Sequence, residues 1–166
     1  CVHLAVFDVE KYLNPFINRG ADYIIVHYEG NCNLKETFKK IRKLGAKPAL
    51  AIRCDTKIPK DFIDLAKECD FILKHTVLPG YSGQPIRMEA LEEVKLMRKI
   101  LNENGMEDKL IETDGNMSLI NVPIAAEFGA NIFTGGTSGL FNKNGTIKEN
   151  AVKMIEVAKE GLKRRC

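Results

Sequence analysis

The sequence predicts an α/β fold built around a parallel β-sheet, and three observations support this prediction. Short apolar segments alternate with segments whose apolar residues recur at helical spacing, from one end of the chain to the other. A Gly-Ala pair follows three of the helical segments, at Gly20, Gly45 and Gly129, where glycine is a common residue just past a helix. Glycine-rich loops follow three of the apolar segments. A repeated strand–helix unit of this kind indicates parallel strands connected by helices.

The predicted strands are the near-continuous apolar runs, which are typical of a sheet buried on both faces. In order they are VHLAV (2–6), YIIVH (23–27), PALAI (48–52), FILKHT (71–76), LIET (110–113) and NIFT (131–134). The segments between and after them carry apolar residues at helical spacing, and predict helices over 9–19, 34–44, 60–68, 88–104, 119–128 and 148–163.

The position of the glycine-rich loops distinguishes between two parallel architectures. A doubly wound open sheet concentrates its ligand loops at one switch point. A (β/α)8 TIM barrel gathers them at its C-terminal face, after many strands. Loops after three strands therefore favour the barrel. A barrel needs eight strands and six are predicted, so we expect residues 1–166 to form a single partial-barrel domain that lacks roughly two βα units.

An incomplete barrel has two open edges, which we expect at strands 2–6 and 131–134. Exposed strand edges invite pairing with another chain, so a homo-oligomer is expected. The composition is ordinary for a globular protein, with 45% apolar residues, 28% charged residues and a net charge of +3. The sequence has no stripe of basic and aromatic residues that would indicate nucleic-acid binding. It also has no apolar run long enough to span a membrane. The five cysteines are scattered without a CxxC pair, which indicates reduced thiols and a cytoplasmic location.

The three glycine-rich loops predict a phosphate site. Glycine lets the backbone approach a ligand closely, and successive free N–H groups beside a helix N-terminus attract a phosphate. One such loop alone would be a weak signal, but three loops at strand ends are a stronger one. The residues that we expect to bind phosphate are Gly80, Tyr81, Ser82, Gly83, Gly115, Asn116, Gly136 and Thr137.

The motifs along the chain resemble those of the ribulose-phosphate 3-epimerase family, in particular its allulose-6-phosphate branch. The segments that carry the resemblance are VHLAV (2–6), GADYIIVHYE (20–29), TVLPGYSGQP (76–85), IETDG (111–115) and GTSGLF (136–141). They follow the family's order and correspond to its strands 3 to 8. The resemblance implies a TIM barrel that binds a ketose phosphate, and it also implies that the first two units are absent from this chain.

The resemblance further implies a metal-assisted epimerisation. In this reaction a proton leaves one face of the carbon beside a ketone and returns on the other, which requires two opposed carboxyl groups. A divalent metal (Zn, Mn, Fe or Co) stabilises the enediolate. Asp114 matches the family's residue that both carries the proton and binds the metal, and His3 matches a second metal ligand. His27 and Glu29 match family positions to which we assign supporting or packing roles.

Without the resemblance, two of these residues have plainer interpretations. Asp114 would also fit as an N-cap of the following helix, a role that Ser118 would fill equally well. A histidine between apolar neighbours, such as His3, is more often packed and hydrogen-bonded than metal-bound. The position of Asp114 at the C-terminal end of a strand favours a site residue.

Several positions depart from the family pattern. The strand-2 segment HxDxMDG, which carries two metal ligands and the second carboxylate, is absent from the sequence. Ala5 and His75 replace methionines that cover the sugar, and Arg53 stands where the family has asparagine. Arg53 and His75 indicate an altered pocket, an additional anion contact or drift after loss of function. His75 would also suit a ligand or general base, although packing is the more common role of such a residue.

These departures leave three functional readings open. The first is an isomerase, a ketose-phosphate 3-epimerase acting on ribulose 5-phosphate or allulose 6-phosphate. The second is a non-catalytic phosphosugar-binding remnant of the barrel. The third is a different phosphate-binding barrel enzyme that uses Asp114 with His75 or Arg53. Because only one of the two opposed carboxylates is present, the chain alone is expected to be inactive.

Overall fold

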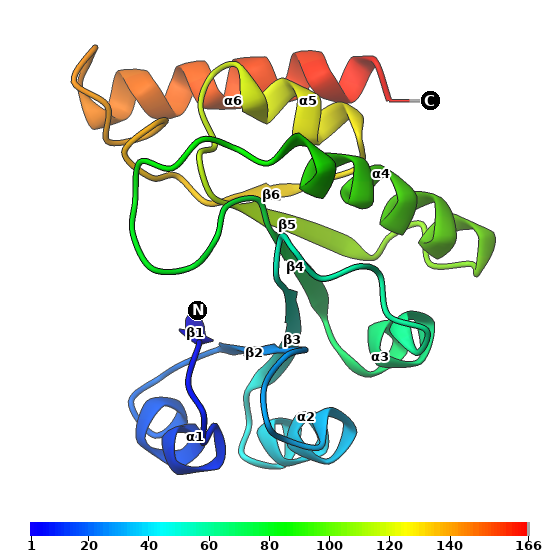
Figure 1. Ribbon diagram of the computed structural model, residues 1–166. Helices are drawn as coiled ribbons and strands as arrows, with labels where there is room; N and C mark the ends of the chain where they lie inside the picture. The colour runs from blue at the N-terminus through cyan, green and yellow to red at the C-terminus, as the bar shows by residue number, and fades with distance from the viewer. Residues whose placement is uncertain (166) are drawn as a thin grey trace.

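Six parallel strands in sequential order form one sheet in the computed structural model, which describes residues 1–165 (Figure 1). The strands are β1 (Val2–Leu4), β2 (Tyr23–His27), β3 (Lys47–Ile52), β4 (Phe71–His75), β5 (Leu110–Asp114) and β6 (Ile132–Phe133). The helices are α1 (Glu10–Ile17), α2 (Leu34–Lys43), α3 (Phe62–Glu68), α4 (Met88–Glu103), α5 (Asn121–Glu127) and α6 (Ile147–Lys163). Every predicted strand and helix is present, in the predicted order.

The sheet is curved, and the helices lie on its outer side. In Figure 1 α1 and α2 lie below the sheet, α3 to its right, and α4, α5 and α6 above it. Within residues 1–165 the first and last strands, β1 and β6, pair with one neighbour each and not with each other. Sequential parallel strands with helices outside are the arrangement of a (β/α)8 barrel, here incomplete. The two open edges are where the sequence predicts them, while the expected homo-oligomer stays a prediction.

The edge strands are shorter than predicted. β1 ends at Leu4 and not at residue 6, and β6 contains Ile132 and Phe133 only. An edge strand has hydrogen-bond partners on one side, so its last residues leave the ladder where the neighbour ends. Several helices are also shorter by one or two residues at an end, such as α3, which begins at Phe62 and not at residue 60.

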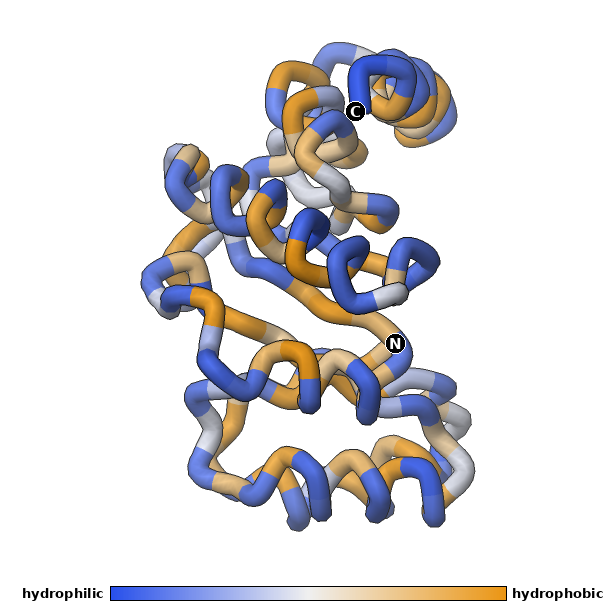
Figure 2. The backbone as a smooth tube through the Cα atoms, turned by 90° about the vertical axis from the view of Figure 1, so that its right-hand side faces the viewer, coloured by the Kyte–Doolittle hydropathy of each residue, from blue (hydrophilic) through white to orange (hydrophobic). Residues whose placement is uncertain are grey.

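Alternation along the strands divides the core into two layers. Residues such as Ile24, Leu50 and Ile72 point to the outer face and join the main core under the helices. Their neighbours on the inner face form a smaller cluster of Ile25, Ala49, Ala51, Phe71 and Leu73. Figure 2 shows the corresponding pattern, with hydrophilic residues on the outward turns of the helices. The polar residues that follow the inner face toward the C-terminal ends of the strands therefore project into the barrel interior.

The structure also bears on the expected reduced thiols and on the expected lack of a membrane span. Cys1, Cys32, Cys54 and Cys69 are free thiols, as predicted, and Cys166 lies outside the described residues. None of the helices in residues 1–165 has the length and apolar character needed to cross a membrane.

Candidate active site

The three glycine-rich loops meet around one cavity of about 260 Å³ at the C-terminal ends of β4, β5 and β6. All eight residues predicted to bind phosphate line it: Gly80, Tyr81, Ser82, Gly83, Gly115, Asn116, Gly136 and Thr137. His75 and Asp114 also line this cavity. The loops are thus brought together as a parallel sheet requires, since the carboxyl ends of its strands share one edge.

Hydrogen bonds fix the shape of the cavity wall. The Gln84 side chain donates from Nε2 to the carbonyl oxygen of Tyr81 at 2.9 Å, which closes the first loop on itself. The Asn116 side chain donates to the carbonyl oxygen of Gln84 at 2.8 Å and joins the first loop to the second. Asn116 has a φ of 51°, a left-handed conformation that asparagine tolerates better than most residues. The wall is therefore ordered by contacts of the chain itself.

Gly115 is the glycine whose role is clearest. Its φ is +118°, and a Cβ atom built there would lie 2.6 Å from Cγ2 of Val77. Only glycine allows this backbone conformation at such close approach. The loop after β5 consequently lies directly against the loop after β4.

The backbone amides of the eight predicted residues point to a common property of this cavity. Among residues 1–165, none of the eight predicted phosphate-binding residues donates its backbone N–H to another residue. Unpaired N–H groups that converge on one space are the property that an anion needs in a binding site. The geometry of these loops therefore suits a phosphate.

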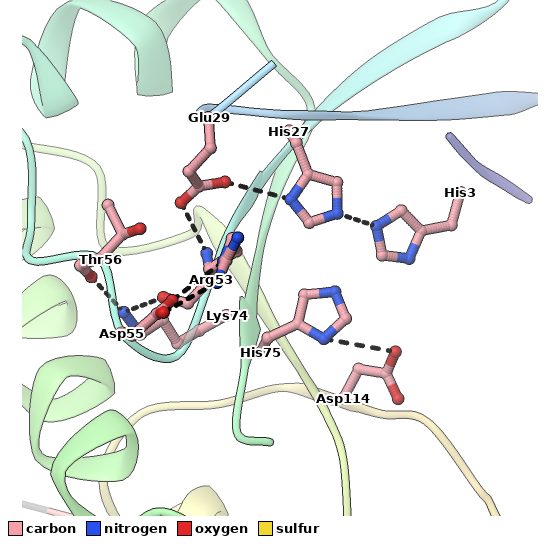
Figure 3. A network of polar contacts seen from close by, with 9 residues as sticks. All are labelled: His3, His27, Glu29, Arg53, Asp55, Thr56, Lys74, His75 and Asp114. Carbon is pink, nitrogen blue, oxygen red and sulfur yellow. Dashed lines mark hydrogen bonds and ion pairs between the residues drawn. The ribbon is translucent and has the colours of Figure 1, made fainter. Parts of the chain in front are cut away.

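A cluster of three histidines lies beside this cavity (Figure 3). The rings of His3 on β1, His27 on β2 and His75 on β4 have centroids 4.9 to 5.3 Å apart, and the ring of His75 is tilted by 34° against that of His3. Nε2 of His3 lies 2.8 Å from Nε2 of His27. Burial, reinforced by the neighbouring histidines, lowers the pKa of His3 and that of His75 to about 4. At neutral pH these two rings are therefore uncharged and their nitrogens can act as ligands.

Glu29 orients the middle histidine. Its Oε2 lies 3.1 Å from Nδ1 of His27, and its Oε1 accepts a 2.9 Å hydrogen bond from the backbone N–H of Arg53. Burial alone would raise the pKa of Glu29, but hydrogen bonds from His27, Thr56 and Arg53 outweigh it and lower this pKa to about 2. The carboxylate is thus ionised and accepts a hydrogen bond from His27, as expected of a supporting residue.

Asp114 ends β5 and lines the phosphate cavity together with His75. Oδ2 of Asp114 lies 4.0 Å from Nδ1 of His75. Burial raises the pKa of Asp114. The N-cap residue of α5 is Ile120, and just before it the Ser118 hydroxyl accepts from the backbone N–H groups of Ile120 and Asn121, so the helix start does not use Asp114. Asp114 is therefore left to face the interior of the site.

The structure groups the candidate ligands differently from the sequence prediction. Among residues 1–165, the side chains close enough to share a metal ion are those of His3, His27 and His75, whose ligand atoms lie within 4.8 Å of one another; Asp114 is not in this group. His27 was expected only in a supporting or packing role, whereas His75 was named as suited to a ligand or general base. Each stands at the C-terminal end of a predicted strand, which is the signal that marks both. The donor set fits a divalent transition metal, because imidazole is a preferred ligand of such ions.

Arg53 does not extend an additional cation toward the phosphate cavity. Its guanidinium forms two hydrogen bonds with the carboxylate of Asp55, at 2.9 and 2.8 Å. Its contribution to the site is the backbone N–H that holds Glu29. Arg53 and His75 both depart from the family pattern, but only His75 belongs to the histidine cluster.

Comparisons with known proteins agree with this picture. Residues 1–141 match the sequence model of the ribulose-phosphate 3 epimerase family. The chain is 38% identical over 144 residues to ribulose-phosphate 3-epimerase of Synechocystis sp., covering 85% of this chain and 61% of that protein. It is 32% identical over 165 residues to the protein of the same name in Chlamydia muridarum, covering 98% of this chain and 71% of that protein.

The solved structures show the same fold. Crystalline 3-hexulose-6-phosphate synthase from Salmonella typhimurium matches 93% of this chain with a TM-score of 0.57. The match covers 68% of that protein at 15% identity, so it speaks for the fold alone. The family relationship is shown by the sequence matches, because the family model spans most of the chain and the curated relatives align along it. The chain belongs to the ribulose-phosphate 3-epimerase family.

Proposed function

We propose that the chain is the greater part of a ketose-phosphate 3-epimerase, an isomerase that acts on ribulose 5-phosphate or allulose 6-phosphate. The observation that carries this proposal is the set of eight backbone amides around one cavity that donate to no other residue among residues 1–165, with Asp114 in the lining of the same cavity. The family relationship supports the reaction, and the four free thiols are consistent with a cytoplasmic enzyme.

In this proposal the glycine-rich loops hold the phosphate and Asp114 moves the proton. The amides of the loops after β4, β5 and β6 bind the phosphate oxygens and fix the sugar's distance from Asp114. The carboxylate of Asp114 takes or returns the proton on the carbon next to the ketone, and its raised pKa makes it a stronger base than an exposed aspartate. His3 and Asp114 would hold the divalent metal that the family relationship implies. When bound, that metal polarises the ketone and hydroxyl oxygens.

The phosphate site is tested on the chain itself. Inorganic phosphate is titrated into ¹⁵N-labelled protein, and the backbone amide signals of Gly83, Gly115 and Gly136 are expected to shift together with one affinity. Signals that shift elsewhere, while these three stay unchanged, would contradict the assignment.

The reaction is tested on an extended protein. The segment of the Synechocystis relative that precedes its match to this chain is joined ahead of Cys1, and exchange of the C3 proton of ribulose 5-phosphate is followed in D₂O. We expect exchange in the extended protein that depends on added metal, and its loss in Asp114→Asn. The 166-residue chain alone should be slower by at least about 10²–10⁴-fold, because one acid–base partner is absent.

The same assay separates the alternative function. A non-catalytic phosphosugar-binding protein would show the phosphate shifts but no exchange in the extended protein. Efficient exchange by the 166-residue chain, or an active Asp114→Asn variant of the extended protein, would instead contradict the role given to Asp114.

A further inference from the structure

A second cavity, of about 600 Å³, lies on the outer side of the barrel, and we call it the outer cavity. Its wall extends from Glu92–Glu103 on α4, over Phe128 after α5, to Arg165 after α6. Helices of a βα repeat run opposite to the strands, so their C-terminal ends lie away from the glycine-rich loops. Figure 1 shows α4 and α6 both ending on the right of the view. Within residues 1–165 no residue lines both this cavity and the phosphate cavity, so the two are separate.

Two guanidinium groups lie in the wall of the outer cavity, and within residues 1–165 both have only neutral partners. Arg98 is 7% exposed and donates to three backbone carbonyl oxygens and to the amide oxygen of Asn131, at 2.7 to 3.3 Å. Arg165 donates to the carbonyl oxygens of Ala126 and Ala130 at 2.5 to 2.9 Å. These hydrogen bonds fix the positions of the two groups but do not neutralise their charge.

The two guanidinium groups are near enough to repel each other. Burial lowers the pKa of Arg98, and the neighbouring charge of Arg165 lowers it further. Both groups stay charged at neutral pH, because a guanidinium is not deprotonated in proteins. Like charges that are partly buried without a counter-charge cost free energy, which an anion bound beside both would remove. Nη1 of Arg165 donates to none of residues 1–165, so its N–H groups are available to such an anion.

The other charges of the wall largely cancel. Lys99 pairs with Glu103 at 3.8 Å, and Arg164 pairs with Glu127 at 2.9 Å. Glu92 adds one exposed carboxylate. The outer cavity therefore keeps an excess of positive charge, and its buried part is at the two guanidinium groups.

An apolar surface lies beside these charges. Leu96 is 48% exposed, although leucine is usually buried, and it lines the cavity together with the half-buried Phe128. The ammonium group of Lys95 lies over the Phe128 ring, 5.1 Å from its centroid. The ligand that suits this wall thus has an anionic end and an apolar end.

We propose that the outer cavity binds a small phosphomonoester that carries a flat ring, such as a nucleoside monophosphate. The phosphate accepts hydrogen bonds from Arg98 and Arg165, because the planar fork of a guanidinium matches phosphate oxygens. The ring lies against Leu96 and Phe128. A volume of about 600 Å³ is in the range of small-molecule sites, about 300–1,000 Å³, and exceeds the needs of a bare phosphate ion. The inference does not rest on the proposed function.

The site is tested by NMR on ¹⁵N-labelled protein titrated with adenosine 5′-monophosphate. We expect the side-chain Nε signals of Arg98 and Arg165 and the backbone amide signals of Leu96 and Phe128 to shift with one affinity. Inorganic phosphate, followed on the same signals, should bind at least about tenfold more weakly, because it lacks the ring. Shifts confined to the glycine-rich loops, or equal affinities for the two compounds at the outer cavity, would overturn the proposal.

Variants assign the binding to the wall of the outer cavity. Arg165→Gln should weaken the binding of the nucleotide by at least about tenfold, through the loss of charged hydrogen bonds. Lys95→Met, at an exposed position where folding is not at risk, should weaken it by about two- to fivefold. The matched control is Lys153→Gln, which removes an exposed cation of α6 that does not line the cavity and should change the affinity by less than about twofold. Unchanged affinity in Arg165→Gln, or an equal loss in Lys153→Gln, would refute the assignment.

Discussion

Replacing Lys74 by methionine should remove one of the main supports of the site. Lys74 stands on β4, its side chain has 0% exposure, and it points away from the barrel interior into the loop after β3. Its ammonium group donates to the carbonyl oxygens of Arg53 and Thr56 at 2.8 and 2.7 Å, and lies 3.7 Å from Oε2 of Glu93. Through Arg53 this loop holds Glu29, which in turn orients His27.

The expected cost follows from these contacts. Each hydrogen bond from a charged donor contributes about 1.5–3 kcal/mol, so the two to carbonyl oxygens contribute about 3–6 kcal/mol. Against this stands the burial of the ammonium, which lowers the pKa of Lys74 and is relieved by the substitution. Methionine fills a similar volume, so no cavity adds to the cost. We expect Lys74→Met to lower the free energy of unfolding by about 3–5 kcal/mol, as is usual when one member of a buried ion pair is removed.

The measurement is urea-induced unfolding with EDTA present, compared at equal m-values. The matched control is Lys57→Met, because Lys57 pairs with the same Glu93 at 3.1 Å but its side chain is 85% exposed, so its loss should cost less than about 1 kcal/mol. Adding Glu93→Leu to Lys74→Met should restore part of the stability by removing the buried carboxylate oxygen, Oε2, that Lys74 faces. A loss below about 1 kcal/mol in Lys74→Met would show that the loop does not depend on this lysine.

Two further predictions concern pH and the loop after β5. In metal-free protein the pKa values of His3 and His75 are about 4, below the ordinary value of 6.5. The free energy of unfolding therefore has its full value above pH 6.5 and decreases as the pH falls to 4. The decrease that is due to His75 is at most about 3 kcal/mol. Thermal unfolding between pH 4 and 7.5 measures it, and an unchanged Tm over that range would contradict it. Gly115→Ala should cost about 1–3 kcal/mol and abolish the phosphate-induced amide shifts, because of its positive φ and the close Val77. Gly136→Ala, whose added Cβ meets nothing within 4 Å, should leave the stability within about 0.5 kcal/mol, and equal losses in both variants would count against this reading.

The order of the elements could be predicted because each strand and helix has its own local pattern. The phosphate loops could be predicted for the same reason: glycine at positions such as 83 and 115 marks a backbone conformation that other residues avoid. The exact ends of β1 and β6 could not, because they depend on how far a neighbouring strand extends.

The histidine cluster could not be predicted, because it depends on the stagger between strands. The ladder places His3 opposite Ile25, and that level continues through Ala49 to Phe71, which precedes His75 on the same inner face of β4. Only the curvature and shear of the sheet bring His75 next to His3 across the interior. A sequence records which residues share a face but does not record this shear, so His27 and His75 seemed to have separate roles.

The shortness of β1 has a consequence for how tightly any ion is held. β1 has three residues that pair on one side only, with β2, so its local unfolding breaks few hydrogen bonds, and His3 is the middle one. Opening of β1 withdraws one ligand, so the apparent affinity for metal equals the intrinsic affinity multiplied by the closed fraction. By linkage, an ion bound to His3 protects the amides of β1 from hydrogen exchange. A segment or partner that covers the free edge of β1 would likewise raise the affinity for the ion.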